Sequence, residues 1–117
     1  MKLAVLIHSL QAWVVHPGAP ADVEIDKVYA GDRISDLLEH AEAHTLVVTS
    51  LANTQLLRVA ELMEAPAICL VGGIEPEAEL AEAAAATATT LIVSPFPLFE
   101  TCGRLYEAMH PGRDNGV

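Results

Sequence analysis

Seven small or polar residues follow three predicted strands of this chain and are the first candidates for binding chemistry. They are Gly31, Asp32, Thr49, Ser50, Asn53, Gly72 and Gly73. Their side-chain oxygens, and the backbone N–H groups of glycine turns and helix starts, are able to hold an anion or a carbonyl group without any basic side chain. We therefore expect these residues to form a ligand site that contains no catalytic residue.

Each of the seven also has a structural interpretation, which is the more common one for residues of these types. The pair Gly72-Gly73 is suited to the positive φ angles of a tight turn between a strand and a helix. Asp32 is suited to cap the helix that follows it. The polar residues between Thr49 and Asn53 are suited to cap the next helix.

Several kinds of catalytic or metal site do not fit the sequence. Neither Lys2 nor Lys27 stands in the GxxxxGK[ST] pattern of a phosphate-binding loop, and no GxSxG pattern marks a hydrolase nucleophile. His40 and His44 have the i, i+4 spacing of two zinc ligands on a helix, but no third ligand accompanies them. We predict no metal, no cofactor and no catalysis.

Strands and helices alternate in the pattern that would bring the seven residues together. Short apolar runs at 45–49, 67–71 and 91–93 predict strands that are buried on both faces. Apolar spacing predicts a helix around 56–63, and a second helix from Pro76 to about Ala86. A final helix is expected with one apolar stripe through Leu98, Phe99, Cys102, Leu105, Tyr106 and Met109.

The first third of the chain adds shorter elements. We expect a helix at 2–10, strands at 12–15 and 28–30, and a helix after Asp32 with its inner face through Ile34, Leu37, Leu38 and Ala41. Alternating strands and helices with right-handed crossovers predict an α/β fold, namely a three-layer domain with a mainly parallel sheet and helices on both faces. Ligands bind such sheets at the carboxyl ends of the strands, where the seven residues are expected.

Length and charge restrict the partners. With 117 residues and 52% hydrophobic content, the chain is expected to form one domain over residues 1–110 and a flexible tail over 111–117. Its formal net charge of −10 opposes binding to nucleic acid and to anionic membranes. The separated Cys69 and Cys102 are typical of reduced thiols in a cytosolic protein.

The amino terminus has two interpretations. Lys2 and the uncharged stretch 3–21 resemble a signal peptide, but polar residues interrupt the apolar run early. We therefore favour a cytoplasmic protein over a secreted one.

Four segments, in order, resemble the DRTGG domain family: VYAGD at 28–32, LVVTS at 46–50, VGGIEPEAE at 71–79 and FETCGRLYE at 99–107. The resemblance covers most of the chain and is greatest to stand-alone members, including those encoded near iron hydrogenase and electron-transfer genes. The family is similar to the N-terminal domain of HPr kinase/phosphorylase and also occurs in some CBS-domain pyrophosphatases. It implies a three-layer fold, a homodimer and a regulatory or interaction role. The chain departs from the family at Ala52-Asn53 and Gln55, where many members carry an Asp-Arg pair and then an acid.

Three classes of function follow from these observations. The first is a non-enzymatic regulatory domain that senses a small molecule or docks on a larger protein, with a link to redox or hydrogenase metabolism implied by the resemblance. The second is a small-molecule enzyme acting at the strand-end loops, for which Asp32 is the one candidate acid or base. The third is a structural module that only dimerises.

Overall fold

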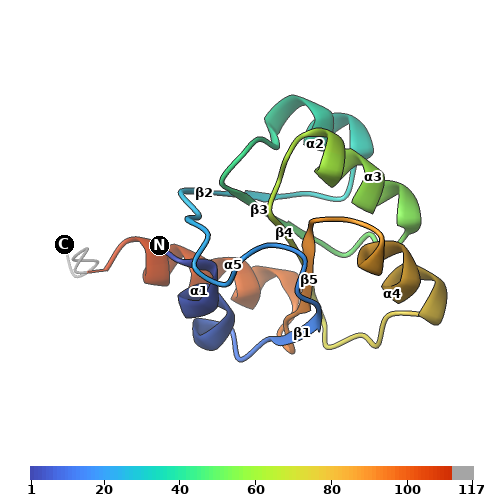
Figure 1. The fold of residues 1–117 in the computed structure, drawn as a ribbon. Coiled ribbons are helices and arrows are strands. Elements are labelled where there is room, and N and C mark those ends of the chain that lie inside the picture. Colours follow the sequence, from blue (N-terminus) through green and yellow to red (C-terminus); the bar gives the residue numbers. More distant parts are fainter. Residues whose placement is uncertain (112–117) are drawn as a thin grey trace.

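A five-stranded sheet runs through the middle of the computed structural model, which describes residues 1–111 (Figure 1). Its strands are β1 (Trp13–His16), β2 (Lys27–Ala30), β3 (Thr45–Thr49), β4 (Ala67–Leu70) and β5 (Thr90–Val93). The order across the sheet is β1-β5-β4-β3-β2. Strands β2 to β5 are parallel to one another, and β1 pairs with β5 in the antiparallel direction.

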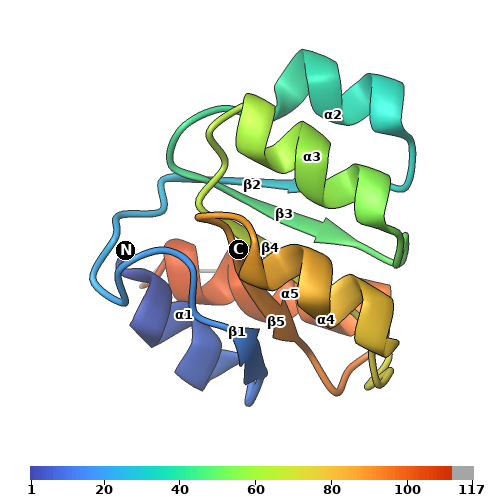
Figure 2. The same ribbon diagram turned by 45° about the vertical axis from the view of Figure 1, so that its right-hand side comes forward.

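Helices cover both faces of this sheet. They are α1 (Leu3–Ser9), α2 (Ile34–His40), α3 (Thr54–Leu62), α4 (Ala78–Ala85) and α5 (Leu98–Met109). Helices α2, α3 and α4 lie on one face, and α1 and α5 lie on the other (Figure 2). The predicted three-layer α/β fold with a mainly parallel sheet is therefore confirmed.

The central strands are apolar throughout because both of their faces are buried. Alternate side chains of a strand point to opposite faces. Val47 and Ile68 pack under α2, α3 and α4, whereas Leu46 and Cys69 pack under α1 and α5. Two separate cores result, one on each side of the sheet.

Two helix starts differ from the predicted ones. Helix α4 begins at Ala78 rather than at Pro76, because Glu77 at its N-cap still has an extended backbone, with φ −64° and ψ 154°. Helix α2 has Arg33 at its N-cap and no side chain caps it. The prediction that Asp32 caps this helix is therefore wrong.

The apolar stripe predicted on α5 is also wrong in part. Thr101 and Leu105 are buried in its inner face, while the Phe99 side chain is 91% exposed and Tyr106 lies at the edge of the contact. The buried face is rotated toward Thr101 because that hydroxyl has partners in the preceding loop. A large aromatic side chain is thus left on the surface.

No helix among residues 1–111 is both long and apolar enough to cross a membrane. The predicted tail at 111–117 lies, from residue 112 onward, outside the described residues.

Candidate functional site

The predicted site residues lie in three turns at one edge of the sheet. Gly31 and Asp32 follow β2, the segment from Thr49 to Asn53 links β3 to α3, and Gly72-Gly73 follows β4. Strands β2, β3 and β4 are neighbours and run parallel, so their carboxyl ends meet at the same edge. The structure therefore places all seven residues at this edge, in two groups with different contacts.

The first group joins the turns after β2 and β3. The carboxylate of Asp32 accepts a hydrogen bond of 2.8 Å from the Thr49 hydroxyl, one of 2.8 Å from the Ser50 backbone N–H and one of 2.7 Å from the Ser50 hydroxyl. In the same place, the backbone N–H of Gly31 donates to the carbonyl of Val48 at 3.0 Å. Asp32 thus connects two neighbouring loops instead of capping its own helix.

These bonds stabilise the charged form of Asp32. The Ser50 hydroxyl, the Ser50 N–H and the Thr49 hydroxyl together lower the pKa of the carboxyl group, and partial burial opposes them only weakly. Hydrogen bonds to a carboxylate stabilise its charged form. Asp32 is therefore ionised at neutral pH. The three donors already occupy most of the acceptor positions of its carboxylate.

Asn53 caps a helix, which is the structural interpretation that the sequence suggested for it beside ligand binding. Its side-chain oxygen accepts a hydrogen bond of 3.0 Å from the backbone N–H of Leu56 and so caps α3. Thr49 and Ser50 do not cap this helix, because their hydroxyl groups donate to Asp32. The Thr49 oxygen also accepts a bond of 3.0 Å from the N–H of Leu51.

The second group ties the turn after β4 to the turn after β5. Gly72 and Gly73 have φ angles of +81° and +63°, which agrees with the predicted turn. The N–H of Gly72 donates to the carbonyl of Phe96 at 2.8 Å, and the N–H of Gly73 donates to the carbonyl of Ser94 at 2.8 Å. Both backbone donors therefore already have acceptors within the protein.

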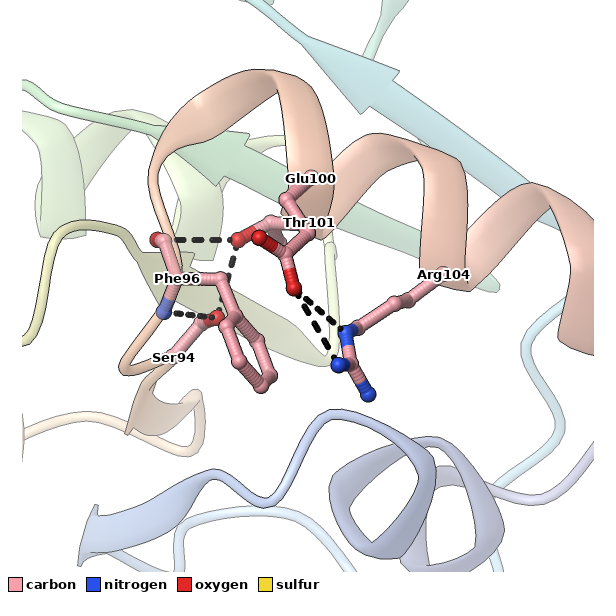
Figure 3. Close-up of polar contacts among 5 residues, drawn as sticks. All are labelled: Ser94, Phe96, Glu100, Thr101 and Arg104. Carbon is pink, nitrogen blue, oxygen red and sulfur yellow. Dashed lines mark hydrogen bonds and ion pairs between the residues drawn. The ribbon is translucent and has the colours of Figure 1, made fainter.

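Two residues outside the predicted site also organise this edge, Ser94 and Thr101. Their hydroxyl oxygens lie 2.8 Å apart, and both side chains are buried (Figure 3). Thr101 donates to the carbonyl of Phe96 at 3.1 Å, so Ser94 is the donor in the bond between the two hydroxyls. Ser94 in turn accepts from the N–H of Phe96 at 3.2 Å. These bonds fix the loop from which α5 starts.

The surface above this loop carries a charged pair and an aromatic ring. Arg104 donates to the carboxylate of Glu100 through two nitrogens, each at 3.1 Å, and its guanidinium carbon lies 3.8 Å from the centre of the Phe96 ring. Figure 3 shows the three side chains together at the start of α5. The salt bridge joins two side chains of α5, and the guanidinium group packs the Phe96 ring against this helix.

A hollow of about 250 Å³ lies beside the first group, between the starts of α3 and α4. It is lined by Ala52, Asn53, Thr54, Glu77, Glu79 and Leu80. Asn53 belongs to the predicted site, and the two glutamates give the hollow a negative rim. A ligand at this edge thus meets carboxylates on both sides.

The histidine and cysteine side chains that could bind a metal or take part in redox chemistry do not form a common site. His40 stacks on Tyr29 at a ring distance of 4.8 Å, whereas His44 lies beyond the end of α2 with its ring 3.0 Å from the carbonyl of Glu24. Within residues 1–111, no three His, Cys, Asp or Glu side chains form a group able to hold a metal ion. Cys69 is buried, and burial raises the pKa of its thiol to about 12.

Comparison with known proteins finds a similarity of fold and none of sequence family. The sequence matches no protein-family model and no curated protein. The structure is similar to that of the CBS and DRTGG domains in the regulatory region of Clostridium perfringens pyrophosphatase, solved in complex with its activator, diadenosine tetraphosphate. The TM-score is 0.71 at 16% sequence identity, over 99% of this chain. The chain spans about half of the length of that structure, 52%.

At this identity the similarity concerns the fold. This similarity of fold agrees with the sequence, in which four segments resemble, in the same order, those of the DRTGG domains. The chain therefore has a DRTGG-like fold.

Proposed function

We propose that this protein is a non-enzymatic regulatory domain that senses a small molecule at the carboxyl edge of its sheet or docks on a larger protein. The fold supports a regulatory role, because the pyrophosphatase region that shares it responds to an activator. The interrupted apolar run at the amino terminus favours a cytoplasmic setting, and the resemblance to stand-alone DRTGG proteins favours a link to redox or hydrogenase metabolism.

One observation carries the choice of binding over catalysis. Asp32, the one candidate acid or base in the predicted site, accepts three hydrogen bonds from Thr49 and Ser50, and its pKa is lowered. A general acid or base needs a pKa near the working pH. A carboxylate held in this way is a poor proton acceptor and a good fixed bridge between two loops, which suits binding.

The charges at the edge define the ligand class. Asp32 and the glutamates at the start of α4 make the edge negative, and the amides of Gly72 and Gly73 already have acceptors. A highly charged polyphosphate would be repelled by an acidic protein. We propose a neutral or singly charged ligand that reaches the edge between Asn53 and the Asp32 loop.

A thermal-shift screen tests this proposal. Nucleotides, with diadenosine tetraphosphate included, are compared with neutral and singly charged metabolites. A ligand selective for the folded state at 100 times its Kd stabilises the protein by about 2.7 kcal/mol. For a metabolite that does so, Ser50→Ala should weaken the shift, whereas Ser35→Ala on the exposed side of α2 should leave it unchanged.

The position of the site is tested separately by amide NMR shifts with the same metabolite. Perturbations should gather on residues 31–32, 49–53 and 72–73. Perturbations confined to α5 would show that the carboxyl edge is not the site and that the helical surface is.

A further inference from the structure

A groove runs along the seam between α3 and α4, on the face of the molecule opposite α1 and α5. The two helices lie side by side over the sheet (Figure 2). The largest hollow of the groove has a volume of about 480 Å³ and is lined by residues of both helices. It shares Thr54 and Glu79 with the hollow at the helix starts, and it shares Glu61 with a third hollow near the other end.

Negative charge dominates this groove. Five glutamates line the three hollows, namely Glu61, Glu64, Glu77, Glu79 and Glu82, and Arg58 is the one basic residue among the lining residues. The segment 59–86 carries six glutamates and no lysine or arginine. The groove therefore carries five of the sixteen acidic residues of the protein beside a single basic one.

These glutamate side chains have no side-chain partner within the described part of the chain. Among the described residues, none of the five glutamate side chains has an ion-pair partner within 4.0 Å or a side-chain hydrogen bond. Glu79 and Glu82 are three residues apart on α4, so their like charges oppose helix formation. These carboxylates are therefore open to the basic side chains of a partner.

The groove is shallow, and its apolar surface is on the α4 side. Ala83 and Ala86 line that side, whereas Leu57 of α3 is only 1% exposed beneath the groove. Small side chains on α4 leave room that a larger residue would fill. A bare metal ion or a small cation would not use this apolar surface, whereas a side chain of an amphipathic segment would.

We propose that the α3–α4 groove docks an amphipathic, lysine- or arginine-bearing segment of a partner protein. Its basic side chains would pair with the glutamates on both rims, and its apolar side chains would cover Ala83 and Ala86, as in helix-in-groove recognition. Helix α3, with nine residues, is about 13 Å long, which matches about two turns of a bound helix. The inference rests on the docking part of the proposed function and names its surface and partner chemistry.

A synthetic helical peptide with lysine on one face and leucine on the other is the test probe. Its affinity is measured by fluorescence anisotropy against the wild type, Glu79→Gln/Glu82→Gln, and the matched control Glu39→Gln/Glu107→Gln. Both double variants change the net charge by the same amount. The groove variant should bind about five- to tenfold more weakly, from the loss of two ion pairs, and the control should bind within about twofold of wild type.

A second peptide of the same composition in scrambled order tests the apolar surface on α4. It should bind at least about fivefold more weakly than the amphipathic peptide, because it cannot place leucines over Ala83 and Ala86 while its lysines face the rims. Amide NMR shifts with the amphipathic peptide should gather on 54–62 and 78–85.

Three results would overturn the proposal: no binding of the amphipathic peptide, equal weakening by the two double variants, or equal binding of the two peptides with full competition by spermine. The second indicates diffuse attraction to an acidic protein, and the third indicates a site for small cations only. If the peptide fails while a metabolite still gives a Ser50-dependent thermal shift, the docking inference is wrong and the sensing function stands.

Discussion

At the scale of single residues, Asp32 is the side chain whose role changed most between sequence and structure. Its three hydrogen bonds link the loops after β2 and β3, and the lowered pKa reports that they stabilise its charged form. A group whose pKa is lower in the folded state adds stability above its unfolded pKa, about 3.9 for aspartate, and loses it as the pH falls through the folded pKa. Asp32 therefore stabilises the protein at neutral pH and not in strong acid.

We predict that Asp32→Ala lowers the free energy of unfolding by about 1 kcal/mol at pH 7, the low end for bonds to a charged group because the side chain is exposed. Urea denaturation at several pH values measures this difference, which should shrink as the pH drops below 4. Asp22→Ala removes an exposed carboxylate for which no bond is recorded, and should cost little at either pH. Equal losses in the two variants would show that the three hydrogen bonds add nothing.

Replacing either of two glycines, Gly73 or Gly103, by alanine should change the stability of the protein in opposite directions. Gly73 has a φ of +63°, and a Cβ there would meet Pro95 at 3.5 Å, so there is space but the backbone conformation is unfavourable for other residues. Gly73→Ala should destabilise the protein by about 1 kcal/mol.

Gly103 lies inside α5, and a Cβ added to it meets no atom within 4 Å. Gly103→Ala should therefore stabilise the protein by about 0.5–1 kcal/mol through helix propensity. Thermal unfolding of both variants compares them directly. A stabilising Gly73→Ala would mean that the turn after β4 adopts another conformation.

At the scale of elements, the loop between β5 and α5 depends on the buried hydroxyl pair of Ser94 and Thr101 (Figure 3). Thr101→Val keeps the shape of the side chain but leaves the Ser94 hydroxyl without its acceptor and the Phe96 carbonyl without one donor. Leaving a buried polar group without a partner costs about 1–3 kcal/mol. We expect a loss of this size in urea denaturation.

Thr54→Val is the matched control, because Thr54 stands at the start of α3 and no side-chain bond is recorded for it. It should change stability by less than about 0.5 kcal/mol. If Thr101→Val and Thr54→Val change the free energy of unfolding by the same amount, the hydroxyl network does not hold α5 in place.

At the scale of the whole molecule, the exposed Phe99 favours the proposed homodimer. Its side chain is 91% exposed and follows the 37% exposed Leu98 on α5, so that two large apolar residues adjoin on one surface, which a second copy would cover. We predict a mass of about twice 12.4 kDa by light scattering at about tens of micromolar protein.

Phe99→Ser should shift this dimer toward the monomer. Leu62→Ser, which removes a 73% exposed side chain from α3 on the other face, should leave the dimer intact. A monomeric wild type at the same concentration would exclude the dimer.

The sequence alone determined the layered fold and the order of its elements. Continuous apolar runs predicted the buried strands β3, β4 and β5 to within one residue at either end, because a strand covered on both faces needs apolar residues at every position. Periodic apolar spacing predicted α3 for the corresponding reason. The strand-end turns could also be assigned to one edge, since neighbouring parallel strands end together.

Only the tertiary structure decided which groups at that edge bind one another. Asp32 is 17 residues from Thr49, and its choice between capping α2 and bridging to β3 depends on the distance between two strands, which local propensity does not contain. The acceptors for the Gly72 and Gly73 amides, the Ser94–Thr101 pair and the exposure of Phe99 likewise depend on how α5 docks on the sheet. Local sequence sets the conformational preference of each segment, whereas contacts between distant segments exist only once the strands are ordered and the helices packed.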